Sequence, residues 1–175
     1  MTTSSRPRAV PGPSEVALDR FYEVEGYRPE TEAVAALDRL WALSLRLGEL
    51  MQRGLAERGI TLARAAVISL LARGGPSTQR ALSLVLRVTP RNITGLVDAL
   101  EGDGLVTRGP HPSDRRATLV SLTAAGASLA ATLQREQDAF AERLFAQTDP
   151  EALLTFMSTV DSVLVQVEGR LNRTP

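Results

Sequence analysis

The chain has 175 residues, no net formal charge at pH 7, and 43% hydrophobic and 23% charged residues, which is typical of about one globular domain. No apolar run approaches the length of about 18 residues needed for a membrane span, and the polar N-terminus lacks the apolar core of a secretory signal. The absence of cysteine excludes disulfides, thiolate nucleophiles and cysteine-based redox sensing. A cytoplasmic location is expected.

The N-terminal third of the chain is predicted to contain an arm and two helices. Residues 1–30 are rich in Ser, Pro, Gly and Arg, which indicates a flexible arm. Apolar residues then recur at spacings of three and four from Thr31, which predicts a long helix that ends near Glu57–Gly59, with residues 31–60 as a dimerisation segment. Thr61 is expected to cap the next helix, which runs to Arg73 and stops at the Gly-Gly-Pro sequence that follows.

Two short helices and a hairpin are predicted next. Ser77 or Thr78 is expected to cap the first helix, and a turn at Arg87 separates it from the second, whose start is marked by Thr89 followed by proline. The apolar side of the first helix is expected to comprise Ala81, Leu82, Val85 and Leu86. The second places Ile93, Leu96, Val97 and Leu100 on one face. The hairpin is predicted from two runs rich in Val, Leu and Thr that flank a polar segment, Leu105–Arg108 and Ala117–Leu122.

The C-terminal residues 123–173 are predicted to form two helices, capped by Thr123 and by Asp149 before proline. The first is expected to turn Leu129, Leu133, Phe140 and Leu144 inward. The second carries apolar residues at alternating spacings of four and three, as in a coiled coil: Leu153, Met157, Val160, Leu164, Val167 and Leu171. Such a seam fits a dimer interface, which we favour, or an intramolecular core.

The second short helix has the polarity of a DNA-recognition helix. If its apolar face is buried, Arg91, Asn92, Thr94 and Gly95 point partly outward at its start, the end that enters a major groove in a helix-turn-helix. Arg91 suits guanine and Asn92 suits adenine. Thr89 suits a phosphate or a thymine methyl group, and Gly95 allows close approach of DNA. An ordinary solvated helix face is the alternative interpretation.

The hairpin tip favours the DNA-binding interpretation. Arg115 and Arg116 follow Asp114, and a rigid hairpin holding arginine beside a recognition helix suits an adjacent minor groove. Asp114 is expected to pair with one guanidinium and orient it; a solvated turn with a surface ion pair is the alternative.

The segment from Arg73 to Ser121 holds seven arginines and four acidic residues, a net charge of +3 that leaves −3 for the rest. A basic reading segment on an acidic body fits contact with phosphate through one face.

The stretch GPSTQRALSLVLRVTPRNITGLVDALEGDGLVTRGPHPSDRRATLVSLTAAG resembles the MarR family of bacterial transcription regulators, and the resemblance extends from about Thr31 to Arg170. It implies a mainly α-helical winged helix-turn-helix of about six helices and a two- or three-stranded β-wing, with residues 61–122 as the DNA-binding domain. It also implies homodimerisation through the N- and C-terminal helices. Thr78 and Gln79 would then contact DNA, Arg116 would enter the minor groove, and Arg115 would lie against the backbone.

Two positions depart from the family pattern. Arg87 stands at a turn position that glycine usually holds, and Gly95 stands where arginine is frequent, with arginine appearing earlier as Arg91. The base preference of relatives therefore does not transfer. The cysteine of peroxide-sensing members is also absent.

The expected function is that of a sequence-specific, ligand-responsive repressor that binds a pseudo-palindromic operator in double-stranded DNA as a homodimer. Trp41 and Leu45 are candidate effector-pocket residues, although plain core or interface suits Trp41 as well. No enzyme activity, metal or cofactor is expected, because His111 is the single histidine and no Gly-rich phosphate loop precedes a helix. The alternative is a winged helix that binds protein rather than DNA.

Overall fold

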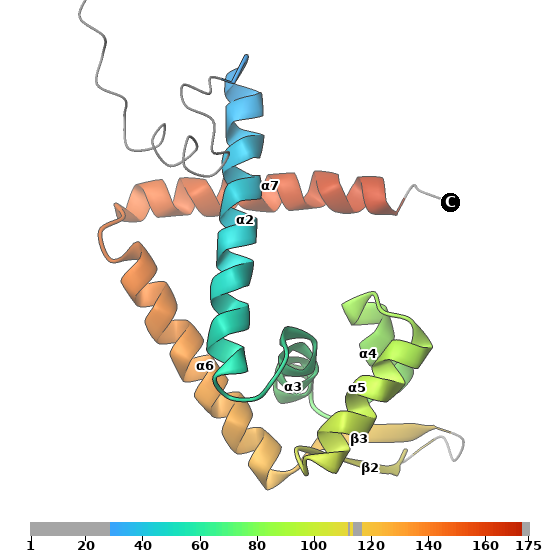
Figure 1. The fold of residues 1–175 in the computed structure, drawn as a ribbon. Coiled ribbons are helices and arrows are strands. Elements are labelled where there is room, and N and C mark those ends of the chain that lie inside the picture. The colour runs from blue at the N-terminus through green and yellow to red at the C-terminus, as the bar shows by residue number, and fades with distance from the viewer. Residues whose placement is uncertain (1–28, 112, 114–116, 173–175) are drawn as a thin grey trace, which may run out of the picture. The chain divides into compact units, whose positions relative to one another are not determined.

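The computed structural model describes residues 29–111, 113 and 117–172. These residues form six helices and a three-stranded sheet (Figure 1), as the sequence predicted. The elements are α2 (Glu32–Ala56), α3 (Leu62–Gly74), β1 (Ser77–Thr78), α4 (Gln79–Leu86), α5 (Pro90–Gly102), β2 (Val106–Pro110), β3 (Thr118–Leu122), α6 (Ala124–Phe145) and α7 (Pro150–Leu171). None of the helices in these ranges is long and apolar enough to cross a membrane. The chain divides into two compact units, Met1–Ala66 and Val67–Pro175.

The predicted helix starts are confirmed. At each of five N-caps the side-chain oxygen accepts a backbone N–H from the first turn, at 3.0–3.2 Å. The capping residues are Thr31, Thr78, Thr89, Thr123 and Asp149. Each cap satisfies a backbone donor that has no partner inside its helix, and such a cap contributes about 1 kcal/mol. The starts of α4, α5, α6 and α7 in the second unit are therefore determined by residues within the first turn of each helix.

In the first unit, α2 leaves its apolar side chains largely uncovered. None of its residues is buried, and seven large apolar side chains on it are exposed: Val34, Leu37, Trp41, Leu43, Leu45, Leu50 and Met51. The predicted length of this helix is confirmed, since it ends at Ala56 before a turn that places Gly59 at a φ of 66°. The arm predicted for residues 1–30 lies almost wholly outside the described residues.

The core of the second unit joins α3, α4, α5 and the sheet. Its fully or nearly fully buried side chains are Val67, Ile68, Leu71, Leu82, Ile93, Val97, Leu100, Val106 and Val120. The sheet is antiparallel with strand order β1-β3-β2. Val120 pairs with Arg108 on one side and with Ser77 on the other, so that the strand before α4 and both strands of the hairpin share one core. The hairpin is therefore rooted beside the two short helices.

The predicted apolar side of α4 was wrong at two positions. Leu82 is buried as expected, whereas Ala81 is exposed and Val85 is 64% exposed. Ser83 is buried instead, and its hydroxyl donates to the Arg80 carbonyl at 2.8 Å. The helix packs through the Leu82 side, and the 81/85 pair lies about 100° further round. Because all four residues are apolar, residue type alone did not distinguish the 82/86 pair from the 81/85 pair.

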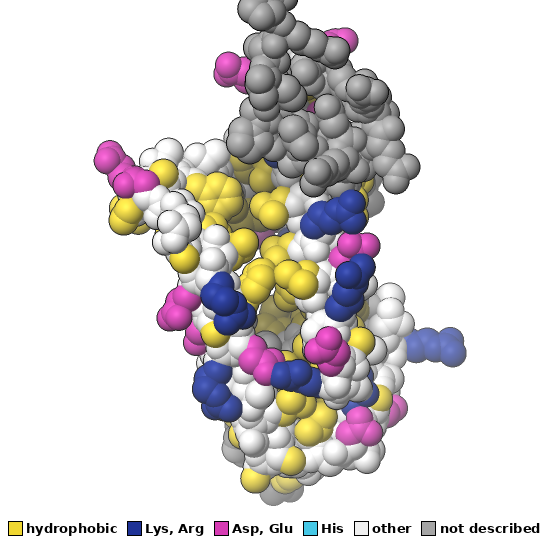
Figure 2. All heavy atoms as spheres, turned by 60° about the vertical axis from the view of Figure 1, so that its left-hand side comes forward, with side chains coloured by type: hydrophobic (Ala, Val, Ile, Leu, Met, Phe, Trp, Pro, Cys, Tyr) yellow, Lys and Arg dark blue, Asp and Glu magenta, His cyan; other side chains and the backbone are white. Residues whose placement is uncertain are grey.

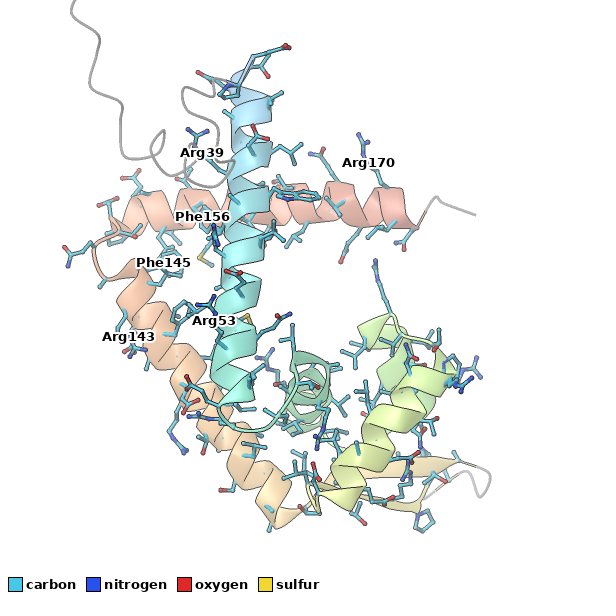
Figure 3. The ribbon with its side chains drawn as sticks, in the orientation of Figure 1. Arg39, Arg53, Arg143, Phe145, Phe156 and Arg170 are labelled. Carbon is cyan, nitrogen blue, oxygen red and sulfur yellow. The ribbon has the colours of Figure 1, made fainter. Side chains whose placement is uncertain are left out.

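The corner between α6 and α7 is held by an aromatic contact. The rings of Phe145 and Phe156 lie with centroids 6.3 Å apart at an interplanar angle of 44°, on either side of the turn (Figure 3). Leu144, expected to point inward, is 50% exposed, because α6 continues beyond the core that covers its first half. Figure 2 shows hydrophobic side chains uncovered on the visible face, with charged side chains between them.

Arg87 adopts the left-handed conformation at the end of α4, with φ 52° and ψ 39°. It is the one non-glycine residue with positive φ in the described part of the chain. Replacing it with glycine is expected to raise the free energy of unfolding by about 0.5–1 kcal/mol, because glycine lacks the Cβ clash, although its unfolded state has more entropy. Thermal denaturation measures this gain. Arg80→Gly inside the same helix should lose about 1 kcal/mol, and a loss in both variants would contradict the account.

Candidate nucleic-acid interface

The buried face of α5 fixes which of its side chains meet solvent. Ile93, Val97 and Leu100 are at most 1% exposed. Arg91 and Asn92, on the other side of the first turn, are exposed. Within the described residues, no hydrogen bond or ion pair engages either of these two side chains. The start of α5 therefore presents a guanidinium and an amide that are available to a partner.

Two further residues predicted to contact DNA are held within the protein. The Thr94 hydroxyl donates to the Pro90 carbonyl at 2.8 Å. With its amide nitrogen turned toward Thr94, Gln79 donates to that hydroxyl at 2.9 Å, and its amide oxygen accepts from Nε and Nη2 of Arg108 at 3.2 and 3.3 Å. This bridge links the first turn of α4 to α5 and to β2.

Arg108, which the sequence analysis did not single out, joins the hairpin to α5. Its Nη2 lies 2.5 Å from Oδ1 of Asp98, its Nη1 pairs with Glu101, and its backbone N–H donates to Glu101 Oε1 at 3.1 Å. Partial burial lowers the pKa of Arg108, but the hydrogen bonds that it donates to Asp98 and then to Glu101 outweigh this effect and raise the pKa above its ordinary value. The guanidinium remains charged, so the link persists at every physiological pH.

Replacing Arg108 with glutamine is expected to lower the free energy of unfolding by about 1 kcal/mol at low salt. The pairs are partly exposed, which limits their contribution, but the change also leaves two carboxylates one turn apart on α5. Denaturation in urea at low and at about 1 M salt measures the effect, which should shrink as salt screens the charges. Arg53→Gln on α2, whose pair with Glu49 is 4.0 Å long and well exposed, should have almost no effect. Equal losses in both variants would show that Arg108 has no special structural role.

The hairpin keeps its strands paired to the edge of its tip. Beyond the Pro110–Thr118 pair, the His111 N–H donates to the Ala117 carbonyl at 3.2 Å, and Nδ1 of His111 accepts the Ser113 N–H at 3.2 Å. The predicted wing residues Asp114, Arg115 and Arg116 follow directly but lie outside the described residues. Their assignment remains a prediction.

The remaining candidates are placed as follows. The hydroxyls of Thr78 and Thr89 accept the backbone N–H groups of Ala81 and Asn92 and cap α4 and α5. Trp41 and Leu45 are 61% and 50% exposed on α2. A surface hollow lies further along the first unit, lined by Gln52, Ala56, Gly59, Ile60, Thr61, Leu62 and Ala63. It does not include either predicted effector residue.

The helix pair and the first strand of the hairpin lie within a segment that matches a known family. Residues 58–117 match the model of the MarR family. Over 86 residues the chain is 37% identical to an uncharacterised HTH-type transcriptional regulator of Mycobacterium bovis, a match that covers 49% of this chain and 60% of that protein. The chain thus spans less than two thirds of that relative's length.

Solved structures are similar to a larger share of the chain. CouR from Rhodococcus jostii, bound to p-coumaroyl-CoA, is 25% identical with a TM-score of 0.65, covering 77% of this chain and 95% of that chain. Streptococcus pneumoniae FabT in complex with DNA is similar in fold alone, with 18% identity, a TM-score of 0.71, and coverage of 77% and 96%. With the helix pair, the three-stranded sheet and the matched segment taken together, the described chain is a winged helix-turn-helix whose residues 58–117 match the MarR family.

Proposed function

We propose that this protein is a transcription regulator that binds duplex DNA sequence-specifically. The observation that carries the proposal is the pair Arg91 and Asn92, exposed at the start of α5. The opposite face of that helix is fixed in the core, and Arg108 ties it to the hairpin. A helix presented in this way can enter a major groove while the hairpin follows the adjacent backbone.

Each exposed group has a defined chemical partner on DNA. The Arg91 fork matches O6 and N7 of guanine, and the Asn92 amide matches N6 and N7 of adenine. Arg116 is proposed to enter the flanking minor groove, with Arg115 on the backbone and Asp114 orienting one of the two guanidinium groups.

A homodimer is proposed to place two such units on one operator. The seam of α7 supports this, because Met157, Leu164 and Val167 are 46–53% exposed in the single chain and Leu153 and Val160 are only partly covered. Exposed apolar residues in a heptad pattern are typical of helix association. Two-fold symmetry then predicts a pseudo-palindromic site with half-site centres about 10 bp, or a multiple of it, apart.

Repression and a small-molecule effector are the proposed mode of regulation. A dimer that occupies consecutive grooves covers DNA that a polymerase must contact, so repression requires no further surface. An effector is proposed to bind against α2 near Trp41 and Leu45 and to weaken DNA binding. The ligand-bound state of CouR supports the idea that this fold accommodates such a molecule.

Replacing Arg91 with alanine is expected to weaken binding to the preferred site by about 1–3 kcal/mol and to relax the preference at one G·C pair. The parent protein would first select its site from random-sequence duplexes, and fluorescence anisotropy on single-pair variants of that site would then compare the two proteins. Arg143→Ala, which removes an exposed arginine from α6, is the control and should leave binding unchanged. If the parent enriches no sequence, the proposed function fails. Unchanged binding by Arg91→Ala would remove the base-reading role.

A further inference from the structure

Gly95 lies in the middle of α5, where the fold does not require glycine. A Cβ built on it meets no atom within 4 Å, its φ is not positive, and the position is exposed. Glycine inside a helix is less stable than alanine, because it loses more backbone entropy on folding. Gly126 is the contrast, since a Cβ there would collide with the Leu105 carbonyl oxygen. The stability that the helix loses by having glycine at position 95 is therefore not offset by any packing contact inside the protein.

The surroundings make Gly95 a gap in the outward surface of α5. Arg91 and Asn92 lie four and three residues earlier, on the same side of the helix. Thr94 is turned toward Gln79, and Asp98, three residues later, is held by Arg108. No neighbouring side chain is thus positioned to fill the space, and the helix surface drops to the backbone at this point.

The chemistry of the gap restricts what can occupy it. Gly95 has no side chain, and within α5 its N–H and C=O belong to the helix ladder. A donor or acceptor of a base edge placed against it would lose water and gain no partner, which is unfavourable. The major groove displays one apolar group, the C5-methyl of thymine. It is the one group in the groove that gains from a surface without hydrogen-bonding capacity.

We infer that Gly95 is a specificity-determining residue and that the space left by its missing side chain receives a thymine methyl group. The inference rests on the proposed function of α5. Gly95 lies about 4.5 Å beyond Asn92 along the helix axis, and successive base pairs are about 3.4 Å apart. The thymine therefore belongs to a base pair neighbouring the one that Asn92 reads.

The test pairs a methyl group added to the protein with a methyl group removed from the DNA. The parent selects its site from random-sequence duplexes, and each thymine of that site is then replaced in turn by deoxyuridine. Gly95→Ala is expected to bind the thymine site roughly 5- to 150-fold more weakly than the parent, the loss caused by one mismatched pair. Deoxyuridine at one position should recover most of this loss for Gly95→Ala, while it should weaken binding by the parent, which loses the contact with the methyl group.

Gly169→Ala on α7 is the matched control, because its added Cβ also meets nothing within 4 Å. Both variants should raise the melting temperature by roughly 1–4 °C, but Gly169→Ala should bind DNA like the parent. If the parent selects a site and Gly95→Ala binds it equally well, or if no deoxyuridine recovers the loss, the inference is overturned while the proposed function stands. If the parent selects no site, the proposed function fails and the inference fails with it.

Discussion

Gly126→Ala is expected to lower the free energy of unfolding by more than about 3 kcal/mol, the upper end of the usual cost of overpacking. An added Cβ would lie 1.9 Å from the Leu105 carbonyl oxygen and 3.2 Å from Cδ2 of Leu122. The carbonyl has no room to move, because its oxygen accepts the Thr123 N–H at 3.1 Å and the Leu105 N–H is bonded to Leu100 at 2.9 Å. The first turn of α6 would have to separate from the loop between α5 and β2.

Urea denaturation of Gly126→Ala measures this loss, with Gly169→Ala as the control for the general effect of alanine in a helix. The control should gain stability slightly, since its Cβ meets open space. If Gly126→Ala does not fold well enough for measurement, the parent and Gly126→Ala are compared in the presence of a stabilising osmolyte, where the loss should have the same sign. A Gly126→Ala protein as stable as the parent would show that α6 does not pack against Leu105 in this way.

Leu164→Glu is expected to convert the proposed homodimer into monomers and to lower operator affinity by about 10²–10⁴-fold, because the second half-site is then no longer bound intramolecularly. Leu164 is 52% exposed in the single chain, and glutamate favours helix about as well as leucine. The subunit should therefore keep its fold. Light scattering reports the mass, circular dichroism the helix content, and anisotropy the affinity.

Val165→Glu is the matched control for the dimer prediction. Val165 is the adjacent residue, is 70% exposed, and lies outside the heptad positions of α7. It should leave both the dimer and the affinity intact. A dimer that persists in Leu164→Glu would place the interface elsewhere. Dissociation in both variants would show that the whole surface of α7, rather than the seam, is involved.

Local chemistry explains why much of the fold was predictable. Capping by Thr31, Thr89 and Asp149 depends on atoms within three residues of each helix start, and such signals are present in the sequence itself. The buried face of α5 followed from spacing alone, since offsets of three and four residues place side chains on one side of any helix. Arg87 was recognised as an unusual turn residue, and its left-handed backbone confirms that reading.

The candidate site was only partly predictable, because its internal bonds join residues far apart in the chain. Gln79 and Thr94 are 15 positions apart, and both bond within the protein, although the family resemblance placed Gln79, and the helix pattern Thr94, toward DNA. Arg108 carried no local signal that it would meet Asp98 and Glu101. A side chain's partner across elements depends on how those elements pack, which periodicity does not specify.

The sequence by itself thus determined where the helices begin, which face of α5 is buried, and that Arg91 and Asn92 lead that helix. Only the tertiary structure decided that Gln79 and Thr94 are held within the protein and that Val85 is exposed. It also decided that Arg108 ties the hairpin to α5. Glycine is required for packing at position 126 but not at position 95. The physical reason is the distance along the chain over which each kind of interaction acts. Caps and helical periodicity act over one or two turns, whereas side-chain networks and close backbone contacts exist only once distant segments have packed.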